Sequence, residues 1–471
     1  IIVGLIILIL GIIGISSLIR KYTPTKETED LNKYFNISSE DESALIVDNT
    51  VSDSKAKLID GKIYVDYNFV HDSLNSRFYW DANENVLLYT TASDIISAAA
   101  DSSTYTVTKQ ATDFDYPIVK ATSSSALIAL DYVKQFSNIT YKSYDKPSRT
   151  VITTSWGKIE TASTAKATQL RVKGGIKSPI LKQVKKGESL TILEKGQKWD
   201  KAASEDGIVG YIKTSTLSDI KTTELKNDDY TEEAFTHIKK DKDICLAWHQ
   251  ITNKSSNSKV ANIISSTKGV NVMSPTWFYL NDNNGGLADL ASKDYVSYCH
   301  SQGIEVWGLF SNLENKDVDA ASVLTHTSTR TTLINQIMSA AFNYELDGVN
   351  IDFENITKEA YGDSYIEFIR ELAIKCHNNG ISLSVDVTVP ASYNKFFNRT
   401  DMANFADYVV IMGYDEHYNG SDAGSVASLP WVTTGLNDTL KEVPADQVIL
   451  GMPLYTRIWE LTPKDADNPV T

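Results

Sequence analysis

Short apolar segments that alternate with helical stretches dominate the second half of the chain, and they constrain its fold more than any other feature. Seven such segments occur from about residue 243 onward, at residues 244–251, 269–273, 305–309, 348–353, 382–387, 408–412 and 447–452. Helical patterns separate them, for example over residues 331–344 and 364–378. Apolar strands that alternate with helices are typical of parallel β/α units. The pattern predicts an α/β fold over residues 235–471, a TIM (β/α)8 barrel that ends before strand eight.

The fourth of these strands carries a run of polar side chains, in the sequence Asp347-Gly-Val-Asn-Ile-Asp-Phe-Glu354. Side chains alternate along a strand, so Asn350, Asp352 and Glu354 share one face. That face points into the barrel, where a carboxylate is costly unless it is paired or used. Asp352 and Glu354 also stand at the C-terminal end, where barrel enzymes place their chemistry. Crowded carboxylates separate each other's pKa values, which leaves one protonated near neutral pH; a buried polar network is the alternative interpretation.

The same octapeptide resembles the D-G-x-D-x-D-x-E signature of glycoside hydrolase family 18, the chitinase-like retaining enzymes. The resemblance extends over residues 243–460. Met412-Gly-Tyr-Asp415 resembles the family's M-x-Y-D motif after strand six, and Gly451-Met-Pro-Leu-Tyr455 resembles its motif on strand seven. The resemblance implies a glycosidase that cleaves a 2-acetamido glycan and requires no cofactor or metal.

The resemblance also implies a role for each matching residue. Glu354 would protonate the glycosidic oxygen, while Asp352 would orient the substrate's own N-acetyl group as the nucleophile. Tyr414 would bind the acetyl carbonyl. The predicted catalytic set is Glu354, Asp352, Tyr414 and Asp347, and the predicted substrate-binding set is Asn350, Asp415, Met412, Trp277, Tyr455, Arg457 and Trp459. For the aromatic residues, packing in the core is an equal alternative to stacking on sugars.

Two departures from the family bear on the substrate. Asn350 replaces the middle Asp of the signature, and Trp307-Gly-Leu-Phe-Ser311 stands in place of a glycine-rich motif. Asn350, together with the segment Asp415-Glu-His417, resembles the subgroup of spore-cortex and cell-wall lytic enzymes. This favours peptidoglycan as the substrate. Two alternatives remain: a hydrolase of chitin or chito-oligosaccharides, and a non-catalytic protein that binds glycans or anchors to the wall.

Two modules are predicted ahead of the barrel. Residues 43–157 contain two related units, beginning at Ile63 and Ala126, each interpreted as a short helix followed by a hairpin. This duplicated α+β stalk module resembles the N-terminal domain of copper amine oxidases, but no cluster of His accompanies it, so no copper is expected. Residues 163–219, with Trp199 and Gly210-Tyr-Ile212, predict a small β-barrel domain that resembles a bacterial Src-homology-3-like domain. That family implies binding to cell-wall peptides.

The first residues of the chain predict a membrane segment. Residues 1–19 contain only apolar residues, Gly and two Ser, which is long enough to span a hydrocarbon core of about 30 Å. The sequence therefore predicts a transmembrane helix at residues 1–21, a linker at 22–42, and an extracytoplasmic protein anchored to a bacterial plasma membrane. The chain begins without Met and stops after the seventh predicted strand, so both ends are expected to be truncated.

The net charge and the cysteine spacing argue against some classes of ligand. The chain has 60 acidic and 45 basic residues and a net charge of −15, which argues against a nucleic-acid partner and fits a polysaccharide. The three cysteines, Cys245, Cys299 and Cys376, lack the spacing of metal ligands. We expect them to be small buried apolar residues.

Overall fold

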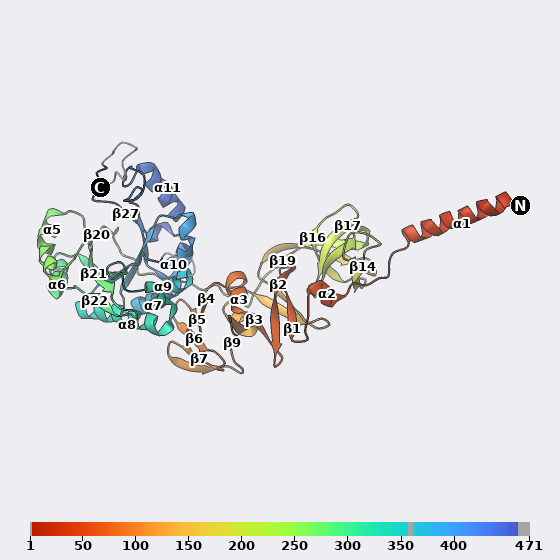
Figure 1. Ribbon diagram of the computed structural model, residues 1–471, viewed down its shortest axis with the longest axis horizontal. Helices are drawn as coiled ribbons and strands as arrows, with labels where there is room; N and C mark the ends of the chain where they lie inside the picture. Colours follow the sequence, from red (N-terminus) through yellow and green to blue (C-terminus); the bar gives the residue numbers. More distant parts are fainter. Residues whose placement is uncertain (1, 357–360, 460–471) are drawn as a thin grey trace. The chain divides into compact units, whose positions relative to one another are not determined.

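The computed structural model describes residues 2–356 and 361–459, and the chain divides into two compact units (Figure 1). The first unit is formed by the residues up to 76 together with residues 117–232. The second unit is formed by residues 77–116 together with the chain from residue 233 onward. The second unit therefore contains the predicted barrel and also a segment of the predicted stalk module.

Seven parallel strands form the central sheet of the second unit, in the order in which they occur along the chain. They are β20 (Leu246–His249), β21 (Val272–Leu280), β23 (Glu305–Ser311), β24 (Gly348–Asp352), β25 (Ser382–Thr388), β26 (Tyr408–Met412) and β27 (Val448–Gly451). The short strand β22 (Leu287–Asp289) pairs antiparallel with β21. The connections contain η2 (Lys254–Lys259), α5 (Val260–Ser266), α6 (Lys293–Ser301), α7 (Ala320–Thr325), α8 (Thr327–Tyr344), α9 (Gly362–His377), η4 (Ser392–Phe397), α10 (Arg399–Phe405), α11 (Leu429–Thr439) and η5 (Ala445–Gln447).

This sheet is a half-barrel, so the predicted fold class needs correction. Closure of a barrel requires hydrogen bonds between the first and last strands. In the described part of the chain, β20 pairs only with β21, and β27 pairs only with β26. Within the described residues the two edges are not joined, so the sheet is open and no complete (β/α)8 barrel is formed there.

Alternation along β24 separates an apolar face from a polar one. Val349, Ile351 and Phe353 are fully or nearly fully buried in the core between the sheet and its helices. The ring of Phe353 stacks on Phe368 of α9, with centroids 5.5 Å apart. The opposite face carries Asn350 and Asp352. Burial of the apolar face thus fixes which side of the sheet receives the polar side chains.

A five-stranded antiparallel sheet from residues 77–116 completes the second unit. Its strands are β4 (Phe78–Asp81), β5 (Val86–Thr90), β6 (Ile95–Ala99), β7 (Thr104–Val107) and β8 (Gln110–Asp113), paired in that order. β4 and β5 lie against α9. The hairpin of the first predicted repeat therefore belongs to the same unit as the parallel strands.

The first unit is built mainly from strands. One seven-stranded sheet has the order β11 (Thr140–Tyr144), β12 (Arg149–Thr153), β1 (Glu42–Val47), β2 (Thr50–Ile59), β3 (Lys62–Asp66), β10 (Ala126–Ala129) and β9 (Val119–Ala121). Its helices are short: α2 (Leu31–Phe35), α3 (Tyr67–Ser73) and α4 (Leu130–Gln135). The predicted α+β class of residues 43–157 is therefore wrong, because this region contains more strand and less helix than expected. The first half of the helix expected from Ile63 is strand β3, because its apolar residues pair with β10, and α3 starts only after the cap at Asp66.

A second sheet of the first unit covers the predicted small β-barrel domain. Its order is β15 (Ile180–Val184), β14 (Thr168–Arg171), β18 (Val209–Lys213), β17 (Trp199–Ser204), β16 (Ser189–Glu194), β13 (Gly157–Thr164) and β19 (Leu217–Leu225), with η1 (Thr214–Thr216) before β19. Leu170 and Ile212 are buried in a core that also includes Phe35 and Ile46, so the two sheets share apolar contacts. Trp199 is half-buried.

The first helix, α1 (Ile2–Tyr22), requires a second correction. Among the described residues, no helix combines the length and the apolar character that crossing a membrane requires. The predicted transmembrane helix at residues 1–21 is therefore wrong, and so is the predicted extracytoplasmic location anchored through it.

The cysteines differ from the expectation at one position. Cys299 and Cys376 are buried, as small apolar residues are, but Cys245 is exposed just before β20. In the described parts of the chain, no group of three or more His, Cys, Asp or Glu side chains is arranged to hold a metal ion.

Candidate functional site

The candidate site lies where the parallel strands end. Asp352 is the last residue of β24, and Glu354 follows two residues later. Ser311, the last residue of β23, lies directly opposite Asp352 in the strand register. Met412 ends β26, and Tyr414 follows it. Since parallel strands bring their carboxyl ends to one edge, these side chains converge there.

Two carboxyl groups at this edge have raised pKa values. Burial, and after it the charges of Glu354 and Glu314, raise the pKa of Asp352 to about 7. Oδ1 of Asp352 is buried and has no hydrogen-bond partner among the described residues. The Glu354 side chain reaches solvent, but burial, followed by the charges of Asp415 and Glu314, raises its pKa as well. The pair can therefore hold a proton near neutral pH.

Asn350 joins three strands beneath this pair. Its Oδ1 accepts hydrogen bonds from Trp248 Nε1 and Ser274 Oγ, each at 3.0 Å. Its Nδ2 donates to Asp386 Oδ1 at 2.7 Å. The indole N–H can only donate, which fixes the orientation of the amide. An Asp at position 350 could not donate to Asp386 unless it were protonated, so the amide here avoids a further buried charge.

Asp386 of β25 is a third carboxyl group with a raised pKa. Burial, followed by the charge of Asp352, raises the pKa of Asp386 well above its usual range, although the bond from Asn350 opposes the shift. The side chain is buried, as are Ser384 on the same strand and Asn350. The floor of the site is therefore a hydrogen-bonded polar layer in which Asp352 carries the only carboxyl oxygen recorded as buried and unpartnered among the described residues.

Tyr414 and Asp415 form the wall on the β26 side. The Tyr414 ring meets Trp248 and Tyr455 edge-on, with centroids 6.3 Å and 6.2 Å away. Burial and the charge of Asp386 raise the pKa of Tyr414, so its hydroxyl stays protonated and can donate. Asp415 has a φ of 63°, a left-handed backbone unusual for a residue other than Gly. Its Oδ1 accepts from Tyr455 Oη at 2.7 Å and from Arg457 Nη2 at 2.5 Å.

Other predicted site residues lie elsewhere or are turned away. Asp347 is at the opposite end of β24, where its Oδ2 accepts from His300 Nε2 and from the backbone N of Val306, each at 2.8 Å. Trp277 is fully buried, and its indole donates to Asn257 Oδ1 at 2.7 Å. Met412 is also buried. The indole of Trp459 donates to the carbonyl of Gly424 at 2.7 Å.

Three residues of the site were missed by the sequence analysis. Trp248 and Asp386 occupy inward positions of β20 and β25, and the period-two alternation of those strands was the signal that could have identified them. Glu314 offered no such signal, because it lies in the irregular segment after β23. Its Oε2 accepts from Ser311 Oγ at 2.5 Å, which holds it near the end of β24.

Two family models match segments of the chain. Residues 310–470 match the family model of glycosyl hydrolases family 18. The matched segment includes Asp352, Glu354 and Tyr414. A second model, the copper amine oxidase N-terminal domain, matches residues 46–153. These matches confirm two of the predicted resemblances, whereas the Src-homology-3-like resemblance of residues 163–219 stays a prediction.

Individual relatives match parts of the chain at low identity. The uncharacterized glycosylase YvbX of Bacillus subtilis (strain 168) is 26% identical over 191 residues, which are 38% of this chain and 55% of the relative. The cortical fragment-lytic enzyme of the same organism is 25% identical over 201 residues, covering 40% of this chain and 46% of the relative. The chain therefore spans about half the length of these curated relatives. The solved chitinase of Chromobacterium violaceum ATCC 12472 superposes with a TM-score of 0.40 at 22% identity, covering 45% of this chain and 68% of that chain.

Proposed function

We propose that the second unit hydrolyses the β-1,4 glycosidic bonds of an N-acetylhexosamine glycan with retention of configuration. The observation that carries this proposal is the pair of carboxyl groups at the end of β24, Asp352 and Glu354, both with raised pKa values. A general acid for glycoside cleavage must be protonated near the working pH and accessible to substrate. Glu354 suits this role, because its raised pKa favours the protonated form and its side chain reaches solvent.

The second carboxyl group, that of Asp352, suits a mechanism in which the substrate's own 2-acetamido group is the nucleophile. The unpartnered Oδ1 of Asp352 can accept a hydrogen bond from the amide N–H of a 2-acetamido group. Tyr414, protonated and at the same edge, can donate to the acetyl carbonyl oxygen, which then attacks the anomeric carbon as the glycosidic bond breaks. Glu354 gives its proton to the leaving oxygen and later takes one from water. Asp352 stabilises the positive charge that develops on the acetamido group.

Peptidoglycan is the substrate that we favour. The curated relatives include cortical fragment-lytic enzymes, and Asn350 replaces the Asp found in the family signature. Chitin contains the same 2-acetamido sugar and is the alternative. Digestion of purified peptidoglycan and of chitin oligomers in parallel, with mass analysis of the products, tests the choice. We expect faster release of fragments from peptidoglycan, and faster cleavage of chitin oligomers would contradict the assignment.

A binding protein without turnover is the competing function. It would use the same site for glycan recognition, but it would not require a proton donor. Both Asp352 and Glu354 are present, and no described cation pairs with either of them. Turnover of either polysaccharide excludes this alternative.

We propose a wall-binding role for the first unit, from the predicted Src-homology-3-like resemblance of residues 163–219. Co-sedimentation of the whole chain with insoluble peptidoglycan tests it. A Glu354→Gln background prevents digestion during the assay. Binding that is lost when soluble chitin oligomers occupy the catalytic site would contradict an independent wall-binding role.

Glu314 gives a prediction for the pH profile. Its negative charge raises the pKa of Glu354, so Glu314→Gln should lower that pKa. The acid must be protonated, so activity falls as the pH rises through the pKa of Glu354. The alkaline limb of kcat/KM should therefore move to lower pH, by less than about one unit. An unchanged limb, or a shift to higher pH, would show that Glu314 does not act on the catalytic acid.

A further inference from the structure

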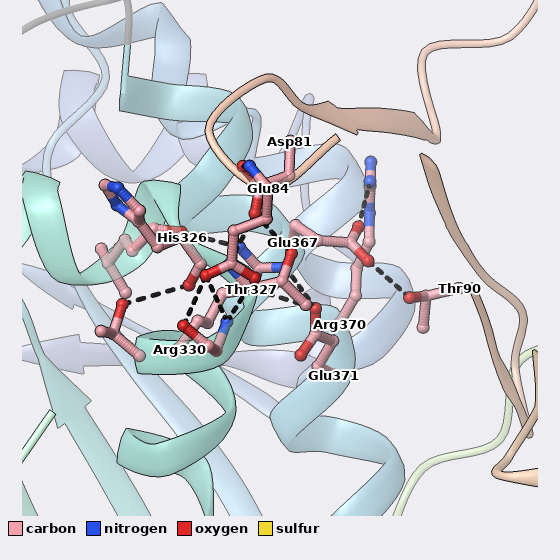
Figure 2. A network of polar contacts seen from close by, with 12 residues as sticks. Asp81, Glu84, Thr90, His326, Thr327, Arg330, Glu367, Arg370 and Glu371 are labelled. Atoms are coloured by element: carbon pink, nitrogen blue, oxygen red, sulfur yellow. Dashed lines mark hydrogen bonds and ion pairs between the residues drawn. The ribbon is translucent and has the colours of Figure 1, made fainter. Parts of the chain in front are cut away.

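The turn between β4 and β5 caps the corner where α7 meets α8 (Figure 2). Oδ2 of Asp81 accepts hydrogen bonds from the backbone N and from Oγ1 of Thr327, each at 2.6 Å. The carboxylate of Glu84 accepts from the backbone N of Ser328 at 3.1 Å. Thr327 and Ser328 are the first two residues of α8. The free amides at this helix end are thus bound by residues more than two hundred positions earlier in the chain.

The helix has no equivalent cap of its own. The N-cap residue of α8, His326, makes no side-chain capping bond. Unpaired amides and the positive end of the helix dipole both favour a carboxylate at such a position. The turn supplies two. The helix end and the turn are therefore complementary in charge and in hydrogen bonding.

Hydrogen bonds within the β4–β5 turn hold it in the conformation that makes this contact. Oδ1 of Asp81 accepts from the backbone N of Asn83 at 2.9 Å and of Glu84 at 3.1 Å, which fixes the loop. Nδ2 of Asn83 donates to the carbonyl of Thr325, the last residue of α7, at 3.2 Å. One turn thus holds the end of α7 and the beginning of α8 together.

Buried ion pairs extend the contact to α9. Arg330 of α8 is fully buried and donates to Glu371 Oε1 from Nε at 3.0 Å and from Nη2 at 2.8 Å. Arg370 Nη1 donates to Glu367 Oε2 at 2.9 Å, and Thr90 Oγ1 of β5 donates to Glu367 Oε1 at 2.7 Å. The Arg330–Glu371 pair joins α8 to α9, and the Thr90 bond joins α9 to β5. Loss of one partner of a buried pair leaves a charge uncompensated, so the pairs hold the two helices together beneath the sheet. Figure 2 shows this layer beside the turn.

We propose that the β4–β8 sheet supports the active site of the second unit, and that Asp81 and Glu84 are positioning residues for that site. Residues 312–326 run from the end of β23 to the corner that the turn holds, and Glu314 is among them. The bond from Ser311 to Glu314 holds the near end of this segment, and the corner holds its far end. The two anchors together keep Glu314 near Asp352 and Glu354. The effect on activity rests on the proposed function, but the effect on α8 does not.

The proposed contact crosses the boundary between the two segments that the family models match. The copper amine oxidase N-terminal model covers residues 46–153, and the family 18 model begins at residue 310. The capping turn lies inside the first of these segments and acts on the second. A catalytic fragment cut from the chain at about residue 233 would lose both carboxylates that cap α8.

Asp81→Ala in the whole chain tests the clamp, with Asp113→Ala as the matched control. Asp113 ends β8 of the same sheet, is exposed, and accepts only from Thr104 Oγ1 among the described residues. Hydrogen exchange followed by mass spectrometry should show the first turn of α8 exchanging on the order of fivefold faster in Asp81→Ala and unchanged in Asp113→Ala. Asp81→Asn, which keeps one acceptor for the turn, should lie between them. Unchanged exchange in both Asp81 variants would overturn the proposal.

The pH profile separates positioning from general destabilisation. The charged groups that act on Glu354 are Asp415 and Glu314, and it shares the site with Asp352. If the segment carrying Glu314 moves away, the pKa of Glu354 falls. The alkaline limb of the kcat/KM profile of Asp81→Ala should then shift to lower pH, as it should in Glu314→Gln. A limb that shifts in Glu314→Gln but not in Asp81→Ala would refute the positioning role. Faster exchange in α8 without any glycan hydrolysis by the unmodified chain would instead refute the proposed function and leave the clamp intact.

Discussion

Glu354→Gln is expected to lower kcat by at least about 10²-fold, because general acid catalysis contributes roughly 10²–10⁴-fold. The amide keeps the shape of the carboxyl group but cannot deliver its proton. Glycan binding should persist, since Glu354 lies at the accessible edge of the site and is not part of the buried polar layer. Steady-state turnover gives the first quantity, and calorimetry with a chitin oligomer gives the second.

Glu345→Gln is a suitable control for this substitution. Glu345 ends α8 in the left-handed conformation and lies at the other end of β24 from the site. It should leave kcat unchanged. Retention of more than roughly a tenth of the original rate by Glu354→Gln would exclude Glu354 as the acid.

Asp352→Asn should reduce kcat by at least about 10²-fold, equivalent to roughly 2.7 kcal/mol. Its charge faces the positive charge that forms in the transition state, so it matters more there than in the ground state. Asn350→Ala should reduce kcat by about tenfold or less. Turnover by the two purified variants is compared directly, after circular dichroism has confirmed that both are folded.

Stability should show the opposite order. Asn350→Ala leaves Trp248, Ser274 and Asp386 without their shared partner, and each unsatisfied buried group costs about 1–3 kcal/mol. Asp352→Asn removes a carboxyl group with an unpartnered buried oxygen, so the free energy of unfolding should change little or rise. Thermal melts measure both. A larger loss of kcat in Asn350→Ala than in Asp352→Asn, with folding intact, would give Asn350 the direct role.

Alternation along single strands was the part of the structure most open to prediction. The expected segments at residues 348–353 and 408–412 correspond to β24 and β26, since both are bounded by sharp changes in polarity. β21 was predicted to end at Met273 but continues to Leu280. The strand continues past Pro275 and absorbs an irregularity in its pairing with β23 between Thr276 and Phe278.

Long-range pairing was the part that could not be predicted. The two repeats have related sequences, but the hairpin β11–β12 joins β1, whereas the hairpin β4–β5 extends into the five-stranded sheet. Residues in contact with the turn, such as Thr327, are distant in the sequence and have no local signature. The membrane prediction was also wrong, because no described helix combines the length and the apolar character that crossing a membrane requires.

In the site, too, residues on one strand could be predicted, whereas contacts between distant segments could not. Asp352 and Glu354 could be identified because they lie on one strand with a period of two. Trp277 could not be assigned, because an aromatic side chain on an apolar strand looks the same whether it faces a sugar or the core. Asp347 shares the motif with Asp352, but it is separated from it by five residues of strand, about 17 Å. A sequence motif thus combined residues from both ends of the sheet.

The configuration of the first product tests the central claim most directly. Proton NMR of an N-acetylated oligosaccharide during the first minutes of hydrolysis distinguishes the two anomers before they interconvert. If the substrate's acetamido group is the nucleophile, with Asp352 and Glu354 in the roles proposed, the initial product retains the β configuration. An initial α product would show direct attack by water and would contradict the mechanism.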